Sequence, residues 1–429
     1  MERVKVGLVG FGTVGSGFYS LMKENGDHFA TKMGTTVEIA TVAEIDPART
    51  RGAVPREQLV EDYRRIIEDE QIQIIVELVG GTTVAYDIIL SAIERGKHVV
   101  TANKALLALR GADLFRAARE KQVELKFEAA VGGGIPIIKV VRESLVGNRI
   151  DKIMGILNGT SNYILTRMSE EQLDFKRALK EAQAAGFAEA DPTLDVGGGD
   201  AAHKISLLAS FAFGGWVDYR QVLCEGISGI TPGEIAFAAS AGFTFKLIAS
   251  AMMVNGLPAV TVFPALIPAD HPLAAVRNEV NAVFLECDFL GPALFLGRGA
   301  GARATASSVA SDLGDLVQRL VLRARRGGYP FDPTRRLDLY PDQDMEYRFF
   351  FHFVTENRPG IWAAVTGCLA ENGINIESVH QKWEDRSKPS DLYILVDEAP
   401  AKQARKALQE VCARPGIFPN SCFYRILPL

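Results

Sequence analysis

The chain has 429 residues, of which 48% are hydrophobic and 23% charged, and its net charge is −5. This length suits two or three domains, and the composition is typical of globular proteins. The charge gives no reason to expect a nucleic-acid partner. No apolar run is long enough to span a bilayer, and the N-terminus enters a strand pattern without a signal peptide. The five cysteines are scattered without a C-x-x-C pair, so we expect a reducing, cytoplasmic location and no zinc ribbon.

The N-terminal stretch has the pattern of a dinucleotide-binding motif. An apolar strand pattern over residues 4–9 runs into Gly10, Gly12 and Gly15, spaced as G-x-G-x-x-G, and an amphipathic run follows from Ser16 to Glu24. Strand, glycine turn and helix in this order let the backbone approach a pyrophosphate at a helix N-terminus. The sequence therefore predicts a Rossmann-type domain that binds NAD or NADP.

The second strand pattern, residues 36–42, bears on the choice between these cofactors. Asp46 follows it, and a carboxylate here is expected to bind the ribose hydroxyls of NAD. Arg49 and Arg51 come next and offer partners for the 2′-phosphate of NADP. Asp46 and Pro47 also suit a simple turn. The choice of cofactor stays open at this point.

Two further strand patterns, residues 72–79 and 97–101, complete the candidate nucleotide sheet, with a helix expected over residues 88–95 between them. Asn103 and Lys104 follow the second of these strands. Ligands of such sheets bind at the carboxyl ends of the strands, so Lys104 is expected near the nicotinamide. The alternative is a surface lysine that opens the next helix. A strand and glycine turn over residues 123–136 are expected to close this domain.

A loop rich in carboxylates lies further along the chain. Glu189, Asp191, Asp195 and Asp200 precede Lys204, and a glycine run separates Asp195 from Asp200. Asp200 is expected to cap the following apolar helix, with Lys204 on the same face four residues later. Such a loop suits a substrate with an ammonium group and a reacting oxygen. The alternatives are an ordinary helix start and a metal loop, although the spacing is unlike that of a calcium loop.

The remaining patterns predict an α/β fold with three parts. The nucleotide-binding domain is expected over residues 1–135, completed by a helix at about 306–326. An α+β substrate-binding and dimerisation domain is expected over residues 136–305. It is expected to contain strands at 150–157, 244–253 and 259–263 and helices at 174–185, 201–213 and 235–239. A glycine turn at 297–302 precedes the returning helix, expected over residues 308–325. Residues 327–344 are expected to be a linker, and residues 345–429 follow the βαββαβ order of a ferredoxin-like unit.

Several motifs together resemble homoserine dehydrogenase over essentially the whole chain. The matching segments are residues 10–15, 101–108, 157–165, 186–196, 200–204 and 299–301. The C-terminal part resembles an ACT domain, a ferredoxin-like amino-acid-sensing module, through residues 357–360 and 374–376. The resemblance implies NAD(P)-dependent interconversion of L-homoserine and L-aspartate 4-semialdehyde. That reaction belongs to threonine, methionine and isoleucine biosynthesis.

The resemblance also implies roles for individual residues. Lys104 and Lys204 match the catalytic pair, with Lys204 as the proton donor in aldehyde reduction and Lys104 as carbonyl polariser. Glu189 and Asp200 match the residues that bind the substrate ammonium, supported by Asp195. A sodium site is implied at Glu128 and at the carbonyls of Val131, Gly133 and Ile135. The implied cofactor contacts are Gly10, Phe11, Gly12, Thr13, Val14, Gly15, Thr82, Thr101, Asn103, Lys104, Gly186 and Gly301.

Some positions depart from the family pattern. Three consecutive glycines, 197–199, replace a more polar run beside the substrate loop, and residues 302–305 replace a proline-rich run after Gly301. Ala43 stands where many relatives carry a basic residue, which favours NAD over NADP. The C-terminal unit is expected to bind threonine and inhibit the enzyme, or only to help form a homodimer or homotetramer.

Two other functions are compatible with parts of the sequence. A non-catalytic sensor would join nucleotide binding to amino-acid sensing, but it would not need both lysines beside the acidic loop. A phosphorylating semialdehyde dehydrogenase needs a cysteine nucleophile, and no cysteine here lies in a recognisable nucleophile turn.

Overall fold

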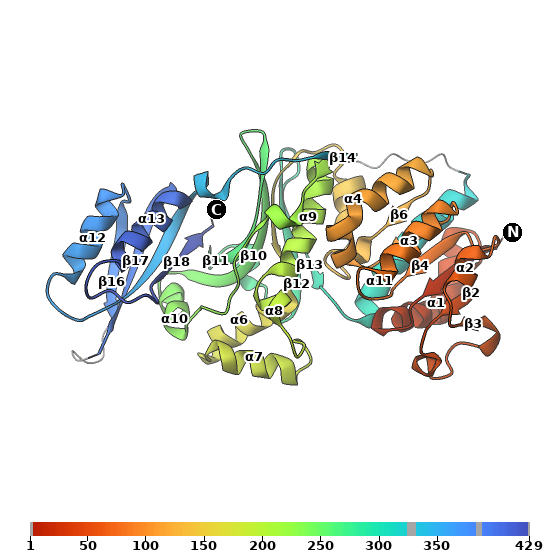
Figure 1. Cartoon of the computed structure of the whole chain (residues 1–429), viewed down its shortest axis with the longest axis horizontal. Coiled ribbons are helices and arrows are strands. Elements are labelled where there is room, and N and C mark those ends of the chain that lie inside the picture. The colour runs from red at the N-terminus through yellow and green to blue at the C-terminus, as the bar shows by residue number, and fades with distance from the viewer. Residues whose placement is uncertain (1–2, 324–331, 383–387, 428–429) are drawn as a thin grey trace.

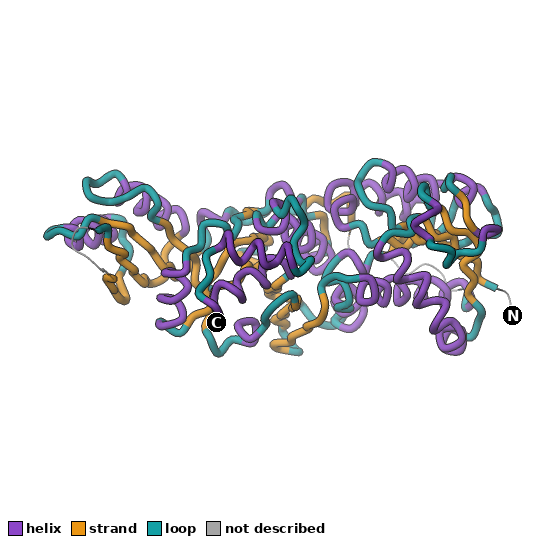
Figure 2. Tube along the Cα trace, turned by 90° about the horizontal axis from the view of Figure 1, so that it is seen from below, coloured by secondary structure: helices purple, strands orange, loops and turns teal. Residues whose placement is uncertain are grey.

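The structure, a computed structural model, describes residues 3–323, 332–382 and 388–427. The molecule is elongated and has three regions in a row (Figure 1). The N-terminal nucleotide-binding region lies at one end, and the C-terminal unit lies at the other. The tube in Figure 2 shows the same row from below. The middle region therefore contacts both ends.

The N-terminal region is built around a six-stranded parallel sheet with the order β3-β2-β1-β4-β5-β6. Its strands are β1 (Val4–Val9), β2 (Val37–Ala43), β3 (Leu59–Val60), β4 (Ile74–Glu77), β5 (His98–Thr101) and β6 (Leu125–Lys126). The covering helices are α1 (Thr13–Met33), α2 (Arg64–Glu68), α3 (Val84–Glu94), α4 (Lys104–Glu120) and α11 (Ala302–Val321). Helix α11 returns from the middle region and packs against α1. This is the predicted doubly wound arrangement, in which ligands bind at the carboxyl ends of the strands.

The middle region and the C-terminal unit share one sheet with the order β13-β12-β7-β10-β11-β18-β15-β17-β16, and β9 pairs with β11 outside this path. The strands of the middle region are β7 (Ile150–Ile156), β9 (Leu223–Cys224), β10 (Phe243–Val254), β11 (Leu257–Pro268), β12 (Val280–Cys287) and β13 (Gly291–Arg298). Its helices are α5 (Ile137–Lys139), α6 (Gly159–Glu171), α7 (Phe175–Ala184), α8 (Thr193–Val196), α9 (Gly199–Phe213) and α10 (Pro232–Ser240).

The C-terminal unit has the predicted βαββαβ order. It consists of β15 (Glu346–Thr355), α12 (Ile361–Glu371), β16 (Ile376–Lys382), β17 (Ser390–Pro400), α13 (Ala401–Cys412) and β18 (Cys422–Ile426). The sequence did not predict that β18 pairs in parallel with β11, through Ala265 with Arg425 and Leu266 with Ile426. This pairing makes the C-terminal sheet continuous with the sheet of the middle region.

Buried charged groups also join these two parts. The carboxylate of Glu234 on α10 lies 2.8 Å from Nδ1 of His352 on β15, and Nε2 of that ring lies 3.0 Å from Asp391. Arg425 on β18 is buried and pairs with Glu225 at 2.7 Å and with Asp342 at 2.9 Å. Removing the C-terminal unit would therefore leave both an open strand edge and unpaired charges in the middle region.

Several predicted elements differ from the structure. Asp200 is not the cap of α9, because the helix already begins at Gly199 and its N-cap is Gly198, in the left-handed conformation. The strand expected after Val123 is only Leu125–Lys126 and is followed by a 3-10 helix, Glu128–Ala130. Helix α11 begins at Ala302, six residues before the predicted start.

The predicted linker contains regular structure where it is described. Strand β14 (Asp332–Arg336) pairs with β8 (Gly215–Trp216), and a 3-10 helix spans Asp342–Asp344. Residues 327–331 of that linker lie outside the described residues. None of the helices in the described part of the chain combines the length and apolar character needed to cross a membrane.

Candidate functional site

A cleft of about 590 Å³ opens where the nucleotide-binding region meets the middle region. Its walls come from segments far apart in the sequence: the ends of α1, α4 and β7, the loop before α8, the first turn of α9, and the turn before α11. The predicted residues that line it are Val14, Lys104, Gly133, Gly186, Glu189, Asp195, Asp200, Lys204 and Gly301. The fold thus brings the two lysines and three of the predicted carboxylates into one cleft.

The two lysines share one carboxylate. Nζ of Lys204 lies 2.7 Å from Oδ2 of Asp200, and Nζ of Lys104 lies 3.4 Å from Oδ1 of the same side chain. Lys104 begins α4 in the nucleotide-binding region, whereas Asp200 and Lys204 lie on α9 in the middle region. Lys204 is buried and also donates to the carbonyl of Leu157 at 2.6 Å. Lys104 is 38% exposed and therefore remains open to the cleft.

Asn158 connects the two aspartates. Its Nδ2 donates to Oδ1 of Asp195 at 2.7 Å and to Oδ2 of Asp200 at 2.9 Å. The hydroxyl of Thr160 donates to the carbonyl of Phe187 at 2.6 Å and lies 3.4 Å from Oδ2 of Asp195. The second oxygen of Asp195 is therefore the least engaged carboxylate oxygen of this pair.

The two aspartates have opposite pKa shifts. Burial alone would raise the pKa of Asp200, but Lys204, Lys104 and Asn158 outweigh it and hold this pKa at about 2. Burial raises the pKa of Asp195, and the hydrogen bond from Asn158 opposes that rise. Asp200 is thus the fixed counter-ion of both lysines, whereas the charge of Asp195 depends on its hydrogen-bond donors.

The glycine motif leaves room for a cofactor. A Cβ on Gly10 would lie 2.7 Å from the carbonyl oxygen of Leu78, and one on Gly15 would lie 2.0 Å from the carbonyl oxygen of Gly10. These two glycines allow the strand-to-helix turn to close tightly. Gly12 and Gly301, by contrast, have no atom within 4 Å of an added Cβ. Their open surroundings and the free helix N-terminus at Gly12 fit a pyrophosphate.

At the end of β2, the acidic residues are already engaged. The carboxylate of Glu44 is buried and accepts hydrogen bonds from the amides of Phe11, at 2.7 Å, and Asp46, at 3.1 Å. Asp46 caps the following 3-10 helix and lies 3.7 Å from Arg49, which is itself largely exposed. Asp46, the predicted partner of the ribose hydroxyls, thus also forms the predicted turn. Arg51 also lies in this exposed turn, in the left-handed conformation.

Two other predicted cofactor residues lie beneath the cleft surface or beside it. Thr101 is fully buried and donates to Glu77 at 2.6 Å, and its hydroxyl accepts from the amide of Asn103 at 3.0 Å. Asn103 caps α4 and donates to the carbonyl of Gly81, which precedes Thr82, at 2.7 Å. Burial raises the pKa of Glu77 to about 7. The Thr101 side chain therefore supports Asn103 from below.

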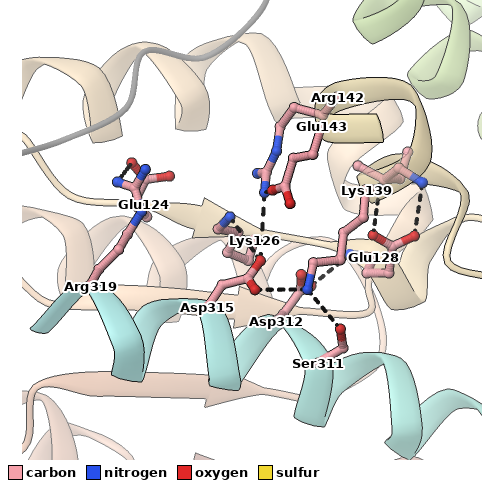
Figure 3. A network of polar contacts seen from close by, with 11 residues as sticks. Glu124, Lys126, Glu128, Lys139, Arg142, Glu143, Ser311, Asp312, Asp315 and Arg319 are labelled. Atoms are coloured by element: carbon pink, nitrogen blue, oxygen red, sulfur yellow. Dashed lines mark hydrogen bonds and ion pairs between the residues drawn. The ribbon is translucent and has the colours of Figure 1, made fainter. Parts of the chain in front are cut away.

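Glu128, the side chain of the predicted sodium site, lies in a buried turn beside α11 (Figure 3). The carboxylate of Glu128 accepts from the amides of Ile138 and Lys139, both at 2.8 Å, and its own amide donates to Asp312 at 2.7 Å. Burial and Asp312 raise the pKa of Glu128 to about 8, and burial raises the pKa of Asp312 to about 7. Two buried carboxylates with raised pKa values provide a setting that a cation would stabilise.

The backbone of the same turn suits such a cation. Val131, Gly133 and Ile135 are buried. The carbonyl of Gly133 accepts from Ser308 at 2.6 Å, and that of Ile135 accepts from Ile137 at 2.8 Å, which leaves each oxygen a second lone pair. Among the described residues, the only close group of three His, Cys, Asp or Glu side chains is Glu234, His352 and Cys422, at the junction with the C-terminal unit.

Sequence reasoning missed several residues of the cleft. Asn281 on β12 donates to the carbonyl of Leu157 at 3.0 Å, the same oxygen that Lys204 contacts, and Glu279 and Arg298 also line the cleft. These residues lie on or beside β12 and β13, which were not predicted. The short apolar run of residues 282–285 and the glycine at 291 were the signals for that hairpin.

The fold and the cleft define an NAD(P)-dependent oxidoreductase that acts on a CH–OH group. Family models agree: residues 10–128 match the NAD-binding domain of homoserine dehydrogenase, residues 136–313 match homoserine dehydrogenase, and residues 353–413 match the ACT domain. A homoserine dehydrogenase from Synechocystis sp. is 42% identical over 435 residues, which cover 99% of each chain. The chain therefore belongs to the homoserine dehydrogenase family.

Solved structures give the same result. A homoserine dehydrogenase from Thiobacillus denitrificans has 35% identity and a TM-score of 0.94, and the match covers 100% of this chain and 99% of that one. A hyperthermophilic archaeal homoserine dehydrogenase in complex with NADPH has 26% identity and a TM-score of 0.61, over 76% of this chain and 100% of that one. The predicted fold class and the predicted family are confirmed.

Proposed function

We propose that Lys104 and Lys204 are the catalytic pair for the interconversion of L-homoserine and L-aspartate 4-semialdehyde. One observation carries this proposal: the two ammonium groups come from different regions of the fold and meet at the two oxygens of the buried Asp200 carboxylate. Lys104 belongs to the nucleotide-binding region and Lys204 to the middle region. The two side chains can therefore act on one substrate only when these regions face each other across the cleft. Bound NAD(P) supplies the nicotinamide C4 that exchanges a hydride with substrate C4.

The protein residues handle the proton and the charge. In homoserine oxidation Lys204, as the neutral amine, accepts the hydroxyl proton and becomes an ammonium group, and in the reverse direction this ammonium returns the proton to the aldehyde oxygen. Lys104, on the open side of the cleft, polarises that oxygen. Glu189 and Asp195 face the substrate ammonium with free carboxylate oxygens, whereas Asp200 keeps both lysines in place. This assignment moves Asp200 from ammonium binding to the lysine pair, because its two oxygens are already occupied.

The direct test is an absorbance assay of NADH and NADPH. Purified full-length protein is incubated with L-homoserine and each oxidised cofactor, and then with L-aspartate 4-semialdehyde and each reduced cofactor. We expect turnover in both directions. Binding of cofactor without turnover of either substrate would favour the non-catalytic sensor instead.

We infer a preference for NAD over NADP. Glu44 and Asp46 bring negative charge to the end of β2, where a 2′-phosphate would lie, and Ala43 supplies no basic side chain. Arg49 opposes this preference, although Asp46 and Glu44 both lie within 4 Å of it. A kcat/KM for NADP at least tenfold above that for NAD would show that Arg49 or Arg51 decides the choice.

We also propose that the ACT domain binds threonine and inhibits the enzyme. The turn at residues 357–360 leads into α12, whose first free N–H groups suit a ligand carboxylate. Threonine lies downstream of homoserine, with methionine and isoleucine the related products. The test is a threonine series on the full-length enzyme, with serine and alanine as control ligands. If threonine does not change the activity, dimerisation would be left as the role of this domain.

The remaining proposals concern the setting of the enzyme. We propose a sodium ion at Glu128 and the carbonyls of Val131, Gly133 and Ile135, which would lower the free energy of the ionised Glu128. We propose a homodimer or homotetramer in the cytoplasm, where its five free cysteines suit a reducing environment. Light scattering of the purified enzyme measures the oligomeric state. An activity assay with potassium in place of sodium measures the dependence on the ion.

A further inference from the structure

We propose that Asn158 is a positioning residue that divides the work of the two aspartates: it presents Asp195 to the substrate ammonium and holds Asp200 with the lysines. This inference rests on the function proposed for the cleft. It concerns a residue that acts through the carboxylates it binds.

The orientation of the Asn158 amide follows from its partners. Its Oδ1 accepts from the amide of Ser161 at 2.8 Å and so caps α6, while its Nδ2 faces the two carboxylates. An ionised carboxylate only accepts hydrogen bonds, and an amide nitrogen only donates them. The reverse orientation would place an oxygen against two carboxylates and an N–H against an N–H. Asn158 is also buried, at the wall of the cleft.

The two hydrogens of one NH₂ group therefore serve two different carboxylates. On Asp200, Asn158 and Lys204 share Oδ2, and Lys104 approaches Oδ1, so both oxygens are engaged. On Asp195, Asn158 engages Oδ1 alone. The single hydrogen of the Thr160 hydroxyl points to the carbonyl of Phe187, because that contact is 2.6 Å and the one to Asp195 is 3.4 Å.

This leaves Oδ2 of Asp195 as the free acceptor on the wall of the cleft, which Glu189 also lines. The Asn158 hydrogen bond stabilises the charged form of Asp195 against burial and against the nearby charge of Asp200. The other charged groups that act on Asp195 are Lys204 on α9 and Lys104 on α4, and both favour its charged form. Losing the Asn158 donors therefore weakens the acceptor that the ammonium needs.

The test compares two variants that keep the helix cap, Asn158→Ser and Asn158→Asp, since Ser and Asp cap as well as Asn. Neither supplies the pair of N–H donors. We expect the homoserine KM to rise about tenfold or more in both, the loss typical of hydrogen bonds to charged groups. We expect a larger rise for Asn158→Asp, which adds a third carboxylate. The Kd of NADH, from fluorescence titration without turnover, should stay within about twofold.

A second readout is the acid limb of the pH profile of kcat/KM for homoserine. It should move to higher pH in Asn158→Ser, because Asp195 loses a hydrogen bond to its charged form. The matched control is Asp174→Ser, which exchanges one capping residue for another on α7 at an exposed position. This control should leave the KM, the pH profile and the melting temperature unchanged.

The outcomes separate the possible roles. An unchanged homoserine KM and acid limb in both variants would make Asn158 a helix cap only and overturn the proposal. Loss of folded protein in both variants, with Asp174→Ser intact, would assign Asn158 to folding and also overturn it. If the wild-type enzyme itself does not turn over homoserine, the proposed function has failed, and that result is distinct from both.

Discussion

Buried carboxylates in the cleft and in the turn beside α11 have pKa values shifted in opposite directions. Asp200 in the cleft and Asp312 on α11 are both almost completely removed from water. The pKa of Asp200 falls to about 2, whereas the pKa of Asp312 rises to about 7 and that of its neighbour Glu128 to about 8. Burial therefore does not decide the charge of a carboxylate in this protein.

The difference lies in which donors touch each oxygen. Asp200 contacts two ammonium groups and one amide side chain. Asp312 accepts from a backbone amide, and the lysines of its network, Lys126 and Lys139, pair with Asp315 at 3.4 and 2.7 Å (Figure 3). A cation in direct contact offsets desolvation, while one that is engaged by another carboxylate offsets it less. In the cleft, the charge of Asp200 is therefore balanced by the two lysines. In the turn, the charges of Glu128 and Asp312 are not balanced, so a further cation would stabilise their ionised forms.

The largest expected effect comes from removing a lysine of the cleft. Lys204→Ala should lower kcat by about 10²-fold or more, the range for losing a general acid-base group, while the Kd of NADH stays near the wild-type value. Lys180→Ala, an exposed lysine of α7, is the matched control and should leave kcat unchanged. Near-normal turnover in Lys204→Ala would remove this residue from the mechanism.

A smaller effect is expected from exchanging the acidic groups, and it separates their roles. Asp195→Asn and Glu189→Gln should chiefly raise the homoserine KM, about tenfold for the first and less for the exposed Glu189, since each loses a charge that faces the ammonium. Asp200→Asn should chiefly lower kcat, because it frees both lysines. Steady-state kinetics at saturating NAD measure this. Equal KM increases in Asp195→Asn and Asp200→Asn would show that the two carboxylates are not divided as proposed.

The smallest effect, on stability, is expected in the buried turn. A raised pKa means that the folded protein holds its proton more tightly than the unfolded chain. The contribution of Asp312 is therefore complete below about pH 4 and is lost as the pH rises through about 7, and that of Glu128 is lost through about 8. Asp312→Asn removes one of these charges, so its melting temperature should fall less than that of the wild type between pH 5.5 and pH 8.5.

Sodium provides the control for that experiment. If a sodium ion binds at the turn, replacing choline chloride with sodium chloride should raise the wild-type melting temperature at pH 8.5 more than at pH 5.5. A stability difference between wild type and Asp312→Asn that is the same at every pH would contradict the raised pKa values.

Much of the fold followed from local patterns in the sequence. The glycine motif, the apolar strands of the nucleotide-binding region and the βαββαβ order were predictable because each depends on neighbouring residues. The acidic loop and its lysine were also visible, since they lie within one short stretch. Asp200 was wrongly placed at the helix cap, because the left-handed conformation of Gly198, which starts α9 earlier, is not visible in a run of three glycines.

The features that were missed depend on residues far apart in the chain. Asn158 stood within a recognised motif, but its two carboxylate partners lie 37 and 42 residues away. The pairing of β18 with β11 joins residues about 160 positions apart. Asn281 could not be placed in the cleft until β12 was found beside β7. Local pattern determined the elements, and only their packing determined which side chains share a site.

The central claim is that two lysines from different regions act as one unit through Asp200, and a double-mutant cycle on Lys104 and Lys204 tests it most directly. Hydride transfer would be followed as NADH absorbance in single-turnover experiments with wild type, Lys104→Ala, Lys204→Ala and the double variant. Residues that act as a unit give strongly non-additive losses. We predict that the double variant is about as slow as the slower single variant. Losses that multiply, so that the double variant is slower by the product of the two single effects, would show that the lysines act independently and would contradict the account.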